Sequence, residues 1–190
     1  MQTEAQKKEA RRVRRRRNRA LSIVFFVTAC VGLAWFFESQ ATTTLIFVRH
    51  ADKASVPVDD PSLTAPGRAR AQALANVLAD VDVVASVDAV YVTQYKRTAE
   101  TAMPLAQRAD VDLSLFDPSD LALAVNQIVK DHKGEIVLVV GHSNTIAPMI
   151  AELGGSKKLP DIGESEYDNL YIVSIPWFGK VKTLRLRYGD

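Results

Sequence analysis

The hydrophobic and polar positions divide the chain into two unlike parts. Residues 20–37 form a run of 18 residues without a charged side chain, whereas the chain from residue 43 onward alternates short apolar runs with amphipathic stretches. Short β-branched runs are typical of buried strands, and apolar residues three and four positions apart are typical of helices. The pattern therefore predicts one apolar helix followed by an α/β domain over residues 43–190.

Two apolar runs indicate that the predicted sheet is covered on both faces. Residues 43–49 read TTLIFVR and residues 135–140 read EIVLVV. Continuous apolar strands of this kind are typical of parallel sheets, which are buried on both sides. The predicted strands are 43–49, 87–93, 111–115 at an edge, 135–140, 171–176 and 180–187, the last two joined by a turn at 177–179.

Helical stretches separate these strands. Thr64 is placed to cap a helix that begins at Ala65 with Pro66 in its first turn, and Gly154 with Gly155 ends the last helix. The predicted helices are 65–79, 96–108, 119–130 and 144–153. Alternating strands and helices predict a three-layer α/β sandwich, a mostly parallel sheet with helices on both faces.

The apolar run at residues 20–37 is long enough to cross a bilayer, which takes about 17–25 residues. Aromatic residues at its end favour the membrane interface, and the basic run Arg11–Arg19 before it favours the cytoplasmic side. The expected organisation is a single-pass membrane protein with a catalytic domain outside the cytoplasm, periplasmic if the host is bacterial. Its parts are a basic cytoplasmic arm (1–19), a transmembrane helix (20–37), a linker (38–42) and the domain (43–190).

Three other interpretations of the N-terminal segment compete with this one. A cleaved signal peptide also begins with basic residues, and Ser39-Gln40-Ala41 resembles a cleavage site, although the apolar run exceeds the usual ~7–15 residues. The residues Val27-Thr28-Ala29-Cys30 resemble a lipoprotein processing box, yet seven more apolar residues follow. A buried core helix would need a polar face, which this run lacks.

The charge distribution bears on possible partners. The first 19 residues hold nine Lys or Arg against two Glu, whereas the remaining chain holds 15 basic and 20 acidic residues. A mildly acidic body argues against nucleic-acid binding, which needs a basic face. The arginine run is instead expected to contact anionic lipid beside the apolar span. The single cysteine, Cys30, excludes an intrachain disulfide.

Two arginines and two histidines follow the ends of predicted strands. Arg49 and His50 end the first, Arg97 follows the second, and His142 follows the fourth. The carboxyl ends of parallel strands meet at one edge of the sheet, where such folds bind ligands. Arginine forks match phosphate oxygens, an imidazole is a competent nucleophile towards phosphorus, and a second, protonated imidazole can stabilise developing charge.

Each of these residues also has a purely structural interpretation, and their joint placement favours the functional one. Arg97 alone is compatible with a surface position at a helix start, and His142 with a strand-to-helix turn that Ser143 caps. The third histidine, His132, is expected to be a solvated helix-end residue. The chain lacks metal-ligand spacings and the P-loop pattern, so we expect a covalent route without metal or cofactor.

Four segments in order resemble the motifs of the histidine phosphatase superfamily, which includes the phosphoglycerate mutases. They read FVRHADK, SLTAPGRARAQALA, VYVTQYKRTAETA and VLVVGHSNTI, and the resemblance covers residues 43–190. It implies an α/β fold, a phosphorylated intermediate on His50, and a phosphate held by Arg49, Arg97 and His142. Thr64 and Gly67 match the family's LTxxG segment, Thr98 and Thr101 match its R-T-x-x-T-A helix start, and Thr93 replaces the usual serine.

The general acid is not evident from the resemblance. Gly-His-Ser-Asn replaces the Gly-His-Asp of the phytase branch, and the segment that carries a glutamate donor in the mutases is short here. Asp117 and Asp120 lie nearest the expected place, with Asp52 and Glu100 as remote alternatives. Asp117 is the candidate acid, and capping of a helix is the competing role. The short segment after Arg97 resembles that of compact family members that act on phosphohistidine in proteins. The nitrogen leaving group of phosphohistidine needs less protonation.

Two functions of different classes follow. The first is a phosphatase that hydrolyses a phosphomonoester or phosphohistidine, its substrate a phosphorylated small molecule, glycolipid or protein. The second is a non-catalytic phosphate-binding or interaction module on the same fold, against which the intact His50 and His142 speak.

Overall fold

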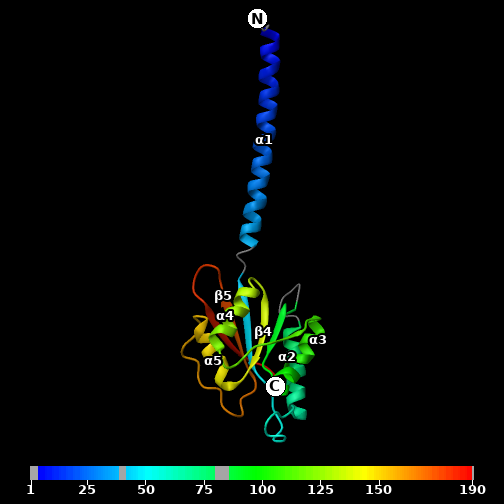
Figure 1. Cartoon of the computed structure of the whole chain (residues 1–190), viewed down its shortest axis with the longest axis vertical. Helices are drawn as coiled ribbons and strands as arrows, with labels where there is room; N and C mark the ends of the chain where they lie inside the picture. Colours follow the sequence, from blue (N-terminus) through cyan, green and yellow to red (C-terminus); the bar gives the residue numbers. More distant parts are fainter. Residues whose placement is uncertain (1–3, 39–41, 80–85, 190) are drawn as a thin grey trace. The chain divides into compact units, whose positions relative to one another are not determined.

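The structure is a computed structural model that describes residues 4–38, 42–79 and 86–189. The chain divides into two compact units, residues 1–40 and residues 41–190. The first unit holds one helix, α1 (Glu4–Glu38), and the second holds a sheet with its covering helices (Figure 1).

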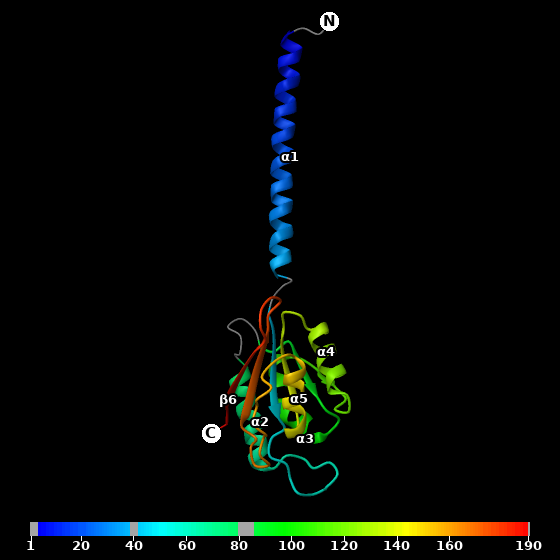
Figure 2. The same ribbon diagram turned by 90° about the vertical axis from the view of Figure 1, so that its left-hand side faces the viewer.

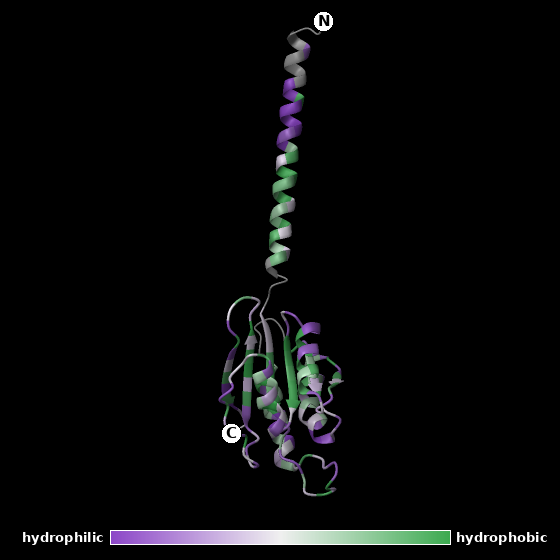
Figure 3. Cartoon of the chain, turned by 60° about the vertical axis from the view of Figure 1, so that its left-hand side comes forward, coloured by the Kyte–Doolittle hydropathy of each residue, from purple (hydrophilic) through white to green (hydrophobic). Residues whose placement is uncertain are grey.

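Helix α1 contains both the basic arm and the apolar run. Its arginines form one hydrophilic stretch and the following turns are apolar (Figure 3). The span Arg11–Phe36 includes an 18-residue window with a mean hydropathy of 1.9, none of it buried. Phe25, for example, is 76% exposed. A core helix buries such residues, so the core-helix interpretation is wrong, whereas length and composition suit a membrane span or a signal sequence alike.

The sheet has six strands in the order β3-β2-β4-β1-β5-β6. Strands β1, β4, β2 and β3 are mutually parallel, and β5 and β6 add an antiparallel pair at the side of β1 (Figure 2). Their bounds are Thr43–Arg49 (β1), Ala89–Val92 (β2), Leu113–Leu115 (β3), Ile136–Gly141 (β4), Asn169–Ile175 (β5) and Lys182–Arg187 (β6). The predicted mostly parallel sheet with an edge strand at residues 111–115 is confirmed.

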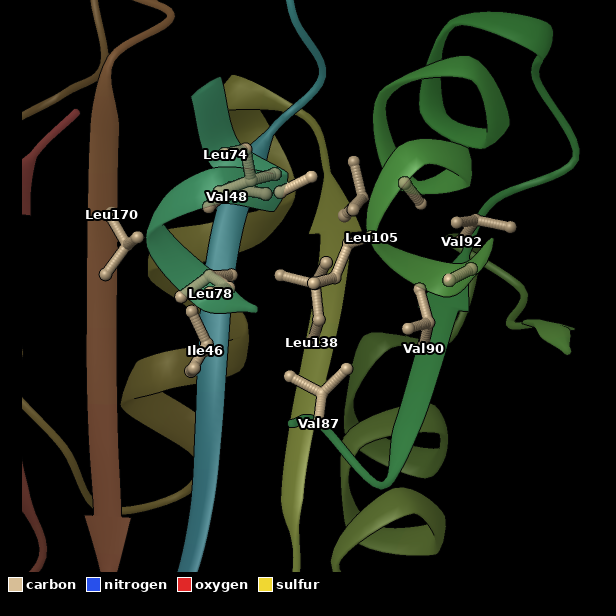
Figure 4. Packing of buried hydrophobic residues seen from close by; sticks show 14 of the residues in the cluster. Ile46, Val48, Leu74, Leu78, Val87, Val90, Val92, Leu105, Leu138 and Leu170 are labelled. Carbon is tan, nitrogen blue, oxygen red and sulfur yellow. The ribbon is translucent and has the colours of Figure 1, made fainter. Parts of the chain in front are cut away.

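Helices cover both faces of the sheet, as the alternation predicted. Helices α2 (Ala65–Leu78) and α3 (Lys96–Ala109) pack on one face, where Leu74 and Leu105 join Ile46 and Leu138 in one core cluster (Figure 4). Helices α4 (Leu121–Asp131) and α5 (Ser143–Glu152) contribute to a second cluster, built around residues such as Phe47 and Val139. Every described core residue lies between Thr43 and Tyr188, so the domain buries its core without α1.

Local signals account for most element boundaries. The side chain of Thr64 caps α2 by accepting the Gly67 N–H at 3.1 Å, as predicted. Gly67 cannot carry a side chain, because a Cβ there would lie 2.2 Å from the Asp52 carbonyl oxygen.

The second strand is shorter than the predicted 87–93. Most of the predicted linker 38–42, and with it the cleavage-like Ser39-Gln40-Ala41, lies outside the described residues.

Strand direction determines where the site must form. Parallel strands β1, β2 and β4 all end at one edge of the sheet, so the segments after Arg49, Val92 and Gly141 meet there. At the opposite edge β1 begins at Thr43, which pairs with Ile175 next to the β5–β6 turn.

Candidate active site

A cavity of about 600 Å³ lies at the carboxyl edge of the sheet. The residues after three different strands line it, so the structure brings the four principal candidates together. Its lining contains all five sequence-predicted site residues, Arg49, His50, Arg97, His142 and Asp117, together with Lys53, Gln94, Tyr95, Pro118, Ser119, Ser143, Asn144 and Thr145.

His50 is held in one orientation and one tautomer. The residue is only 4% exposed, and its backbone N–H donates to the Gly141 carbonyl, which ties the end of β1 to the end of β4. The Nδ1 atom lies 2.9 Å from the Ala51 carbonyl oxygen. A carbonyl can only accept, so Nδ1 carries the proton and Nε2 keeps the lone pair. His50 is therefore arranged as a nucleophile through Nε2.

Arg49 is anchored from one side and unsatisfied on another. Its Nη1 donates to the carbonyl oxygens of Gly163, Glu164 and Glu166 at 2.7, 3.0 and 3.1 Å. Its guanidinium carbon stands 4.3 Å from the centre of the Tyr167 ring. The buried Nε has no hydrogen-bond partner among the described residues, which leaves a charged donor for a ligand.

Arg97 has the same combination of support and unmet donors. Its guanidinium carbon lies 4.1 Å from the centre of the Tyr95 ring, and Nη1 is 4.0 Å from the Asp60 carboxylate. Its Nε is buried and has no partner within the described part of the chain. Two arginines from separate strands thus carry orphaned donors in one cavity, and a phosphoryl group has the oxygens to satisfy them.

His142 is held by a chain of hydroxyl groups. Its Nε2 lies 3.0 Å from Thr93 Oγ1, which lies 3.1 Å from Thr98 Oγ1. The Thr98 hydroxyl is 2.7 Å from the Tyr95 carbonyl oxygen, which can only accept. The arrangement that satisfies every member runs from His142 Nε2–H through Thr93 and Thr98 to that carbonyl. The His142 ring faces the His50 ring at 5.4 Å between centroids.

Both imidazoles are neutral in this environment. Burial lowers the pKa of His50 to about 3, with further lowering from His142, Arg49 and Arg97. Burial lowers the pKa of His142 to about 4, and Arg97, Arg49 and Lys53 lower it further. A neutral His50 suits nucleophilic attack. The sequence-based expectation of a protonated His142 is not met in the protein without a bound anion, because burial, and after it the charges of Arg97, Arg49 and Lys53, lower the pKa of this ring.

These shifts predict a pH dependence of stability. An unfolded chain protonates histidine near pH 6.5, whereas folded His50 stays neutral to about pH 3. The unfolded state then binds more protons, so the free energy of unfolding falls as the pH drops below 6.5. Between pH 7 and pH 5, the free energy of unfolding of the fragment 42–190 should fall in wild type and fall less in His50→Gln. We expect the two falls to differ by roughly 2 kcal/mol, measured by urea unfolding. Equal losses in the two proteins would contradict this environment for His50.

The candidate acids prove to be engaged elsewhere. Asp117 lines the cavity, but its Oδ1 accepts the Ser119 N–H at 2.8 Å, and this hydrogen bond lowers the pKa of its carboxyl group. Asp120 caps α4 by accepting the Leu123 N–H at 3.0 Å. Asp52 pairs with Arg70 at 2.9 Å, and Glu100 accepts the Leu63 N–H at 2.7 Å. Asp52, Asp120 and Glu100 are absent from the cavity lining.

His132 differs from its predicted role as a solvated residue. Its Nδ1 lies 2.7 Å from Glu135 Oε2 and its Nε2 lies 2.9 Å from the Tyr91 hydroxyl. It therefore joins the end of α4 to β2 and to the residue before β4, and it is absent from the cavity lining. Among the described residues, no three His, Cys, Asp or Glu side chains are grouped so as to hold a metal ion.

Sequence reasoning missed the residues that support the arginines. Tyr95, which supports Arg97, and Lys53, which lines the cavity, lie within the quoted segments, so a search there for aromatic or basic residues would have found them. Tyr167 and the carbonyl groups around Gly163 belong to a loop without any motif, more than 100 residues from Arg49. No sequence signal indicated that contact.

Solved structures share the fold at low sequence identity. The protein histidine phosphatase SixA, complexed with tungstate, has a TM-score of 0.63 at 18% identity, covering 76% of this chain and 96% of that one. A mycobacterial glucosyl-3-phosphoglycerate phosphatase with inorganic phosphate has a TM-score of 0.56 at 17% identity, covering 77% and 97%. A phosphoserine phosphatase mutant from Entamoeba histolytica has a TM-score of 0.57 at 14% identity, covering 78% and 97%.

The sequence comparison finds a match to one family over part of the chain. No curated protein sequence matches the chain. Residues 45–117, however, match the sequence profile of the histidine phosphatase superfamily (branch 1), a stretch that holds Arg49, His50 and Arg97. His142 lies beyond that stretch, and the fold brings it beside His50. The motifs, the fold and this match over residues 45–117 agree, and together they support a histidine-type phosphatase of the histidine phosphatase superfamily.

Proposed function

We propose that this phosphatase hydrolyses a phosphomonoester or a phosphohistidine through a covalent phosphohistidine intermediate on His50. The observation that carries the proposal is the fixed tautomer of His50. Its Nδ1 is committed to the Ala51 carbonyl, so the lone pair of Nε2 remains for phosphorus. The two orphaned arginine donors in the same cavity support a phosphoryl group as the ligand.

The reaction takes two displacements at phosphorus. In the first, the Nε2 lone pair forms a bond to phosphorus while the bond to the leaving group breaks with its electron pair. In the second, water attacks phosphorus, the P–N bond breaks, and the electron pair returns to Nε2. Arg49 and Arg97 hold the phosphoryl oxygens throughout, because their planar, permanently charged groups match that geometry.

His142 is proposed to respond to the bound phosphate. Burial lowers the pKa of His142, and the positive charges of Arg97, Arg49 and Lys53 lower it further; a phosphate dianion would offset these charges. His142 would then take up a proton, donate to a phosphoryl oxygen, and keep its other hydrogen bond to Thr93. The protonated second imidazole expected from the sequence thus belongs to the substrate-bound state.

The hydrogen-bonded state of the candidate acids indicates which substrates suit the site. A general acid works best with a pKa near the working pH, and the pKa of Asp117 is shifted the other way. Leaving groups that depart with little protonation are favoured under that condition. Phosphohistidine has such a group, and the similar SixA structure is described as a protein histidine phosphatase. We propose phosphohistidine or another activated phosphate ahead of alkyl phosphates.

Asp117→Asn tests the role of that carboxylate. An Asn side chain can still accept the Ser119 N–H, so the turn is kept and only the proton is lost. We expect the rate of the variant to stay within about threefold of wild type on nitrophenyl phosphate and also on an alkyl phosphate. A loss of about 10²-fold or more confined to the alkyl ester would identify Asp117 as the acid. Asp120→Asn, at the cap of α4, is the matched control.

Residues 20–37 are proposed to anchor the domain as an uncleaved, single-pass transmembrane helix. The length and hydropathy of α1 support a span, and the arginines before it support a cytoplasmic N-terminus. Carbonate washing of membranes, followed by N-terminal sequencing of the mature protein, tests this. A retained chain that keeps residues 20–37 agrees with an anchor, whereas a chain that begins after Ala41 would identify a cleaved signal.

A further inference from the structure

The turn between β5 and β6 exposes two large aromatic side chains at its tip. Trp177 is 65% exposed and Phe178 is 88% exposed. Gly179 follows with φ at +119°, a conformation that allows the chain to reverse there and that other residues rarely adopt. Exposed apolar side chains gathered at one point mark contact with a partner or with a membrane.

The tip lies at the sheet edge where the chain enters the domain. Thr43, the first residue of β1, pairs with Ile175, the last residue of β5. Only four residues separate Glu38 of α1 from Thr43, so their Cα atoms are at most about 17 Å apart. If α1 spans a bilayer, the start of β1 and its neighbours are held near the bilayer surface.

Basic side chains surround this tip. Lys180 and Lys182 follow it directly and are exposed. The exposed Lys157 and Lys158 lie near the start of β6, because the Ser156 N–H donates to Thr183 Oγ1 at 3.0 Å. Four carboxylates at this edge lie mainly across β1 and are hydrogen-bonded: Asp88 to Ile136, Asp131 to Gln127, Glu135 to His132 and Glu152 to Asn126. The exposed Asp110 and Asp112 lie farther from the tip, before the opposite edge strand β3. Lysines around exposed aromatic residues suit an anionic lipid surface.

We propose that the β5–β6 tip, Trp177 with Phe178, inserts into the interface of the membrane that holds α1, and that the surrounding lysines contact anionic headgroups. The inference rests on the proposed anchoring by α1. Tryptophan favours the headgroup region, and lysine stems extend along apolar surface while the ammonium groups stay in water. A second attachment point would hold the domain in one orientation.

That orientation bears on the substrate. The cavity lies at the carboxyl end of β1, and the tip lies beside its amino end. Seven strand residues rise about 23 Å, so with β1 upright on the bilayer the cavity would stand well above the headgroups. A phosphate carried by a lipid of the same bilayer would not reach His50. The glycolipid considered among the substrates is thereby disfavoured, and phosphorylated proteins or soluble phosphates are favoured.

Tryptophan quenching by brominated lipid in vesicles with anionic lipid tests the proposal on the full chain. The chain has two tryptophans, so Trp35→Phe leaves Trp177 as the only reporter. Trp177→Phe leaves Trp35, which reports whether α1 lies in the bilayer. A third protein replaces both by Phe and carries Val58→Trp, an 80% exposed position in the loop that follows the other end of β1. None of these positions lines the cavity, so activity on nitrophenyl phosphate checks each fold.

We expect bromine to quench Trp35 and Trp177 strongly and to leave the tryptophan at position 58 at its level in unbrominated vesicles. Quenching of Trp35 without quenching of Trp177 would overturn the inference while leaving the anchor intact. Equal quenching at positions 58 and 177 would overturn the fixed orientation. If Trp35 is not quenched, the proposed anchor fails and the inference fails with it.

Discussion

His50→Ala is expected to lower kcat/KM by at least about a thousandfold, because no other group in the cavity is placed to form the covalent intermediate. His142 is the other imidazole there, and its Nε2 is committed to Thr93. The variant should remain folded, since His50 lines an open cavity that the smaller side chain only enlarges, and its backbone hydrogen bond to Gly141 is kept. Steady-state hydrolysis of nitrophenyl phosphate measures the loss.

His132→Ala is the matched control for that experiment. His132 lies outside the cavity lining and holds the end of α4 through Glu135 and Tyr91. We expect it to lower the thermal unfolding midpoint while kcat stays within about twofold of wild type, since such a half-buried pair contributes roughly 1 kcal/mol. Wild-type turnover by His50→Ala would contradict the covalent mechanism.

Arg97→Lys is expected to lose roughly a hundredfold or more in kcat/KM although the charge is kept. Lysine is a point charge without the planar guanidinium fork. It cannot stack a planar group on the Tyr95 ring and at the same time hold a donor at the position of Nε. The loss should appear in the affinity for inorganic phosphate as well, because the phosphoryl oxygens are the ligands of this group. Isothermal titration and steady-state kinetics measure the two quantities.

Arg108→Lys gives the comparison for Arg97, since it lies exposed in the last turn of the same helix. It should match wild type in both measurements. Full activity and full phosphate affinity in Arg97→Lys would mean that Arg97 does not hold the phosphate.

The carboxyl ends of the strands could be predicted because local sequence determines them. The run TTLIFVR predicts a buried strand that ends at Arg49, and parallel pairing with the strand before Gly141 then places His50 beside His142. The same reasoning places Arg97 at the start of α3. The placement of four site residues at one edge thus follows from strand direction, whereas their roles came from the family resemblance.

Other features depend on distant contacts or on summed charge, which no local pattern reports. The three carbonyl groups that hold Arg49 come from a loop near Gly163, brought there by the antiparallel return of β5. The neutral state of His142 follows from burial beside two arginines and Lys53. The end-of-helix position of His132 suggested solvent, but its partner Tyr91 comes from a strand 41 residues earlier.

Mapping the phosphorylated residue tests the central claim most directly. The wild-type protein is mixed with excess nitrophenyl phosphate, quenched in alkali within the first turnover, digested, and analysed by mass spectrometry for an acid-labile, base-stable phosphoryl group. We expect that group on His50, appearing together with the first equivalent of released nitrophenol. Release of that equivalent with the phosphoryl group on another residue, or with none on His50, would contradict it.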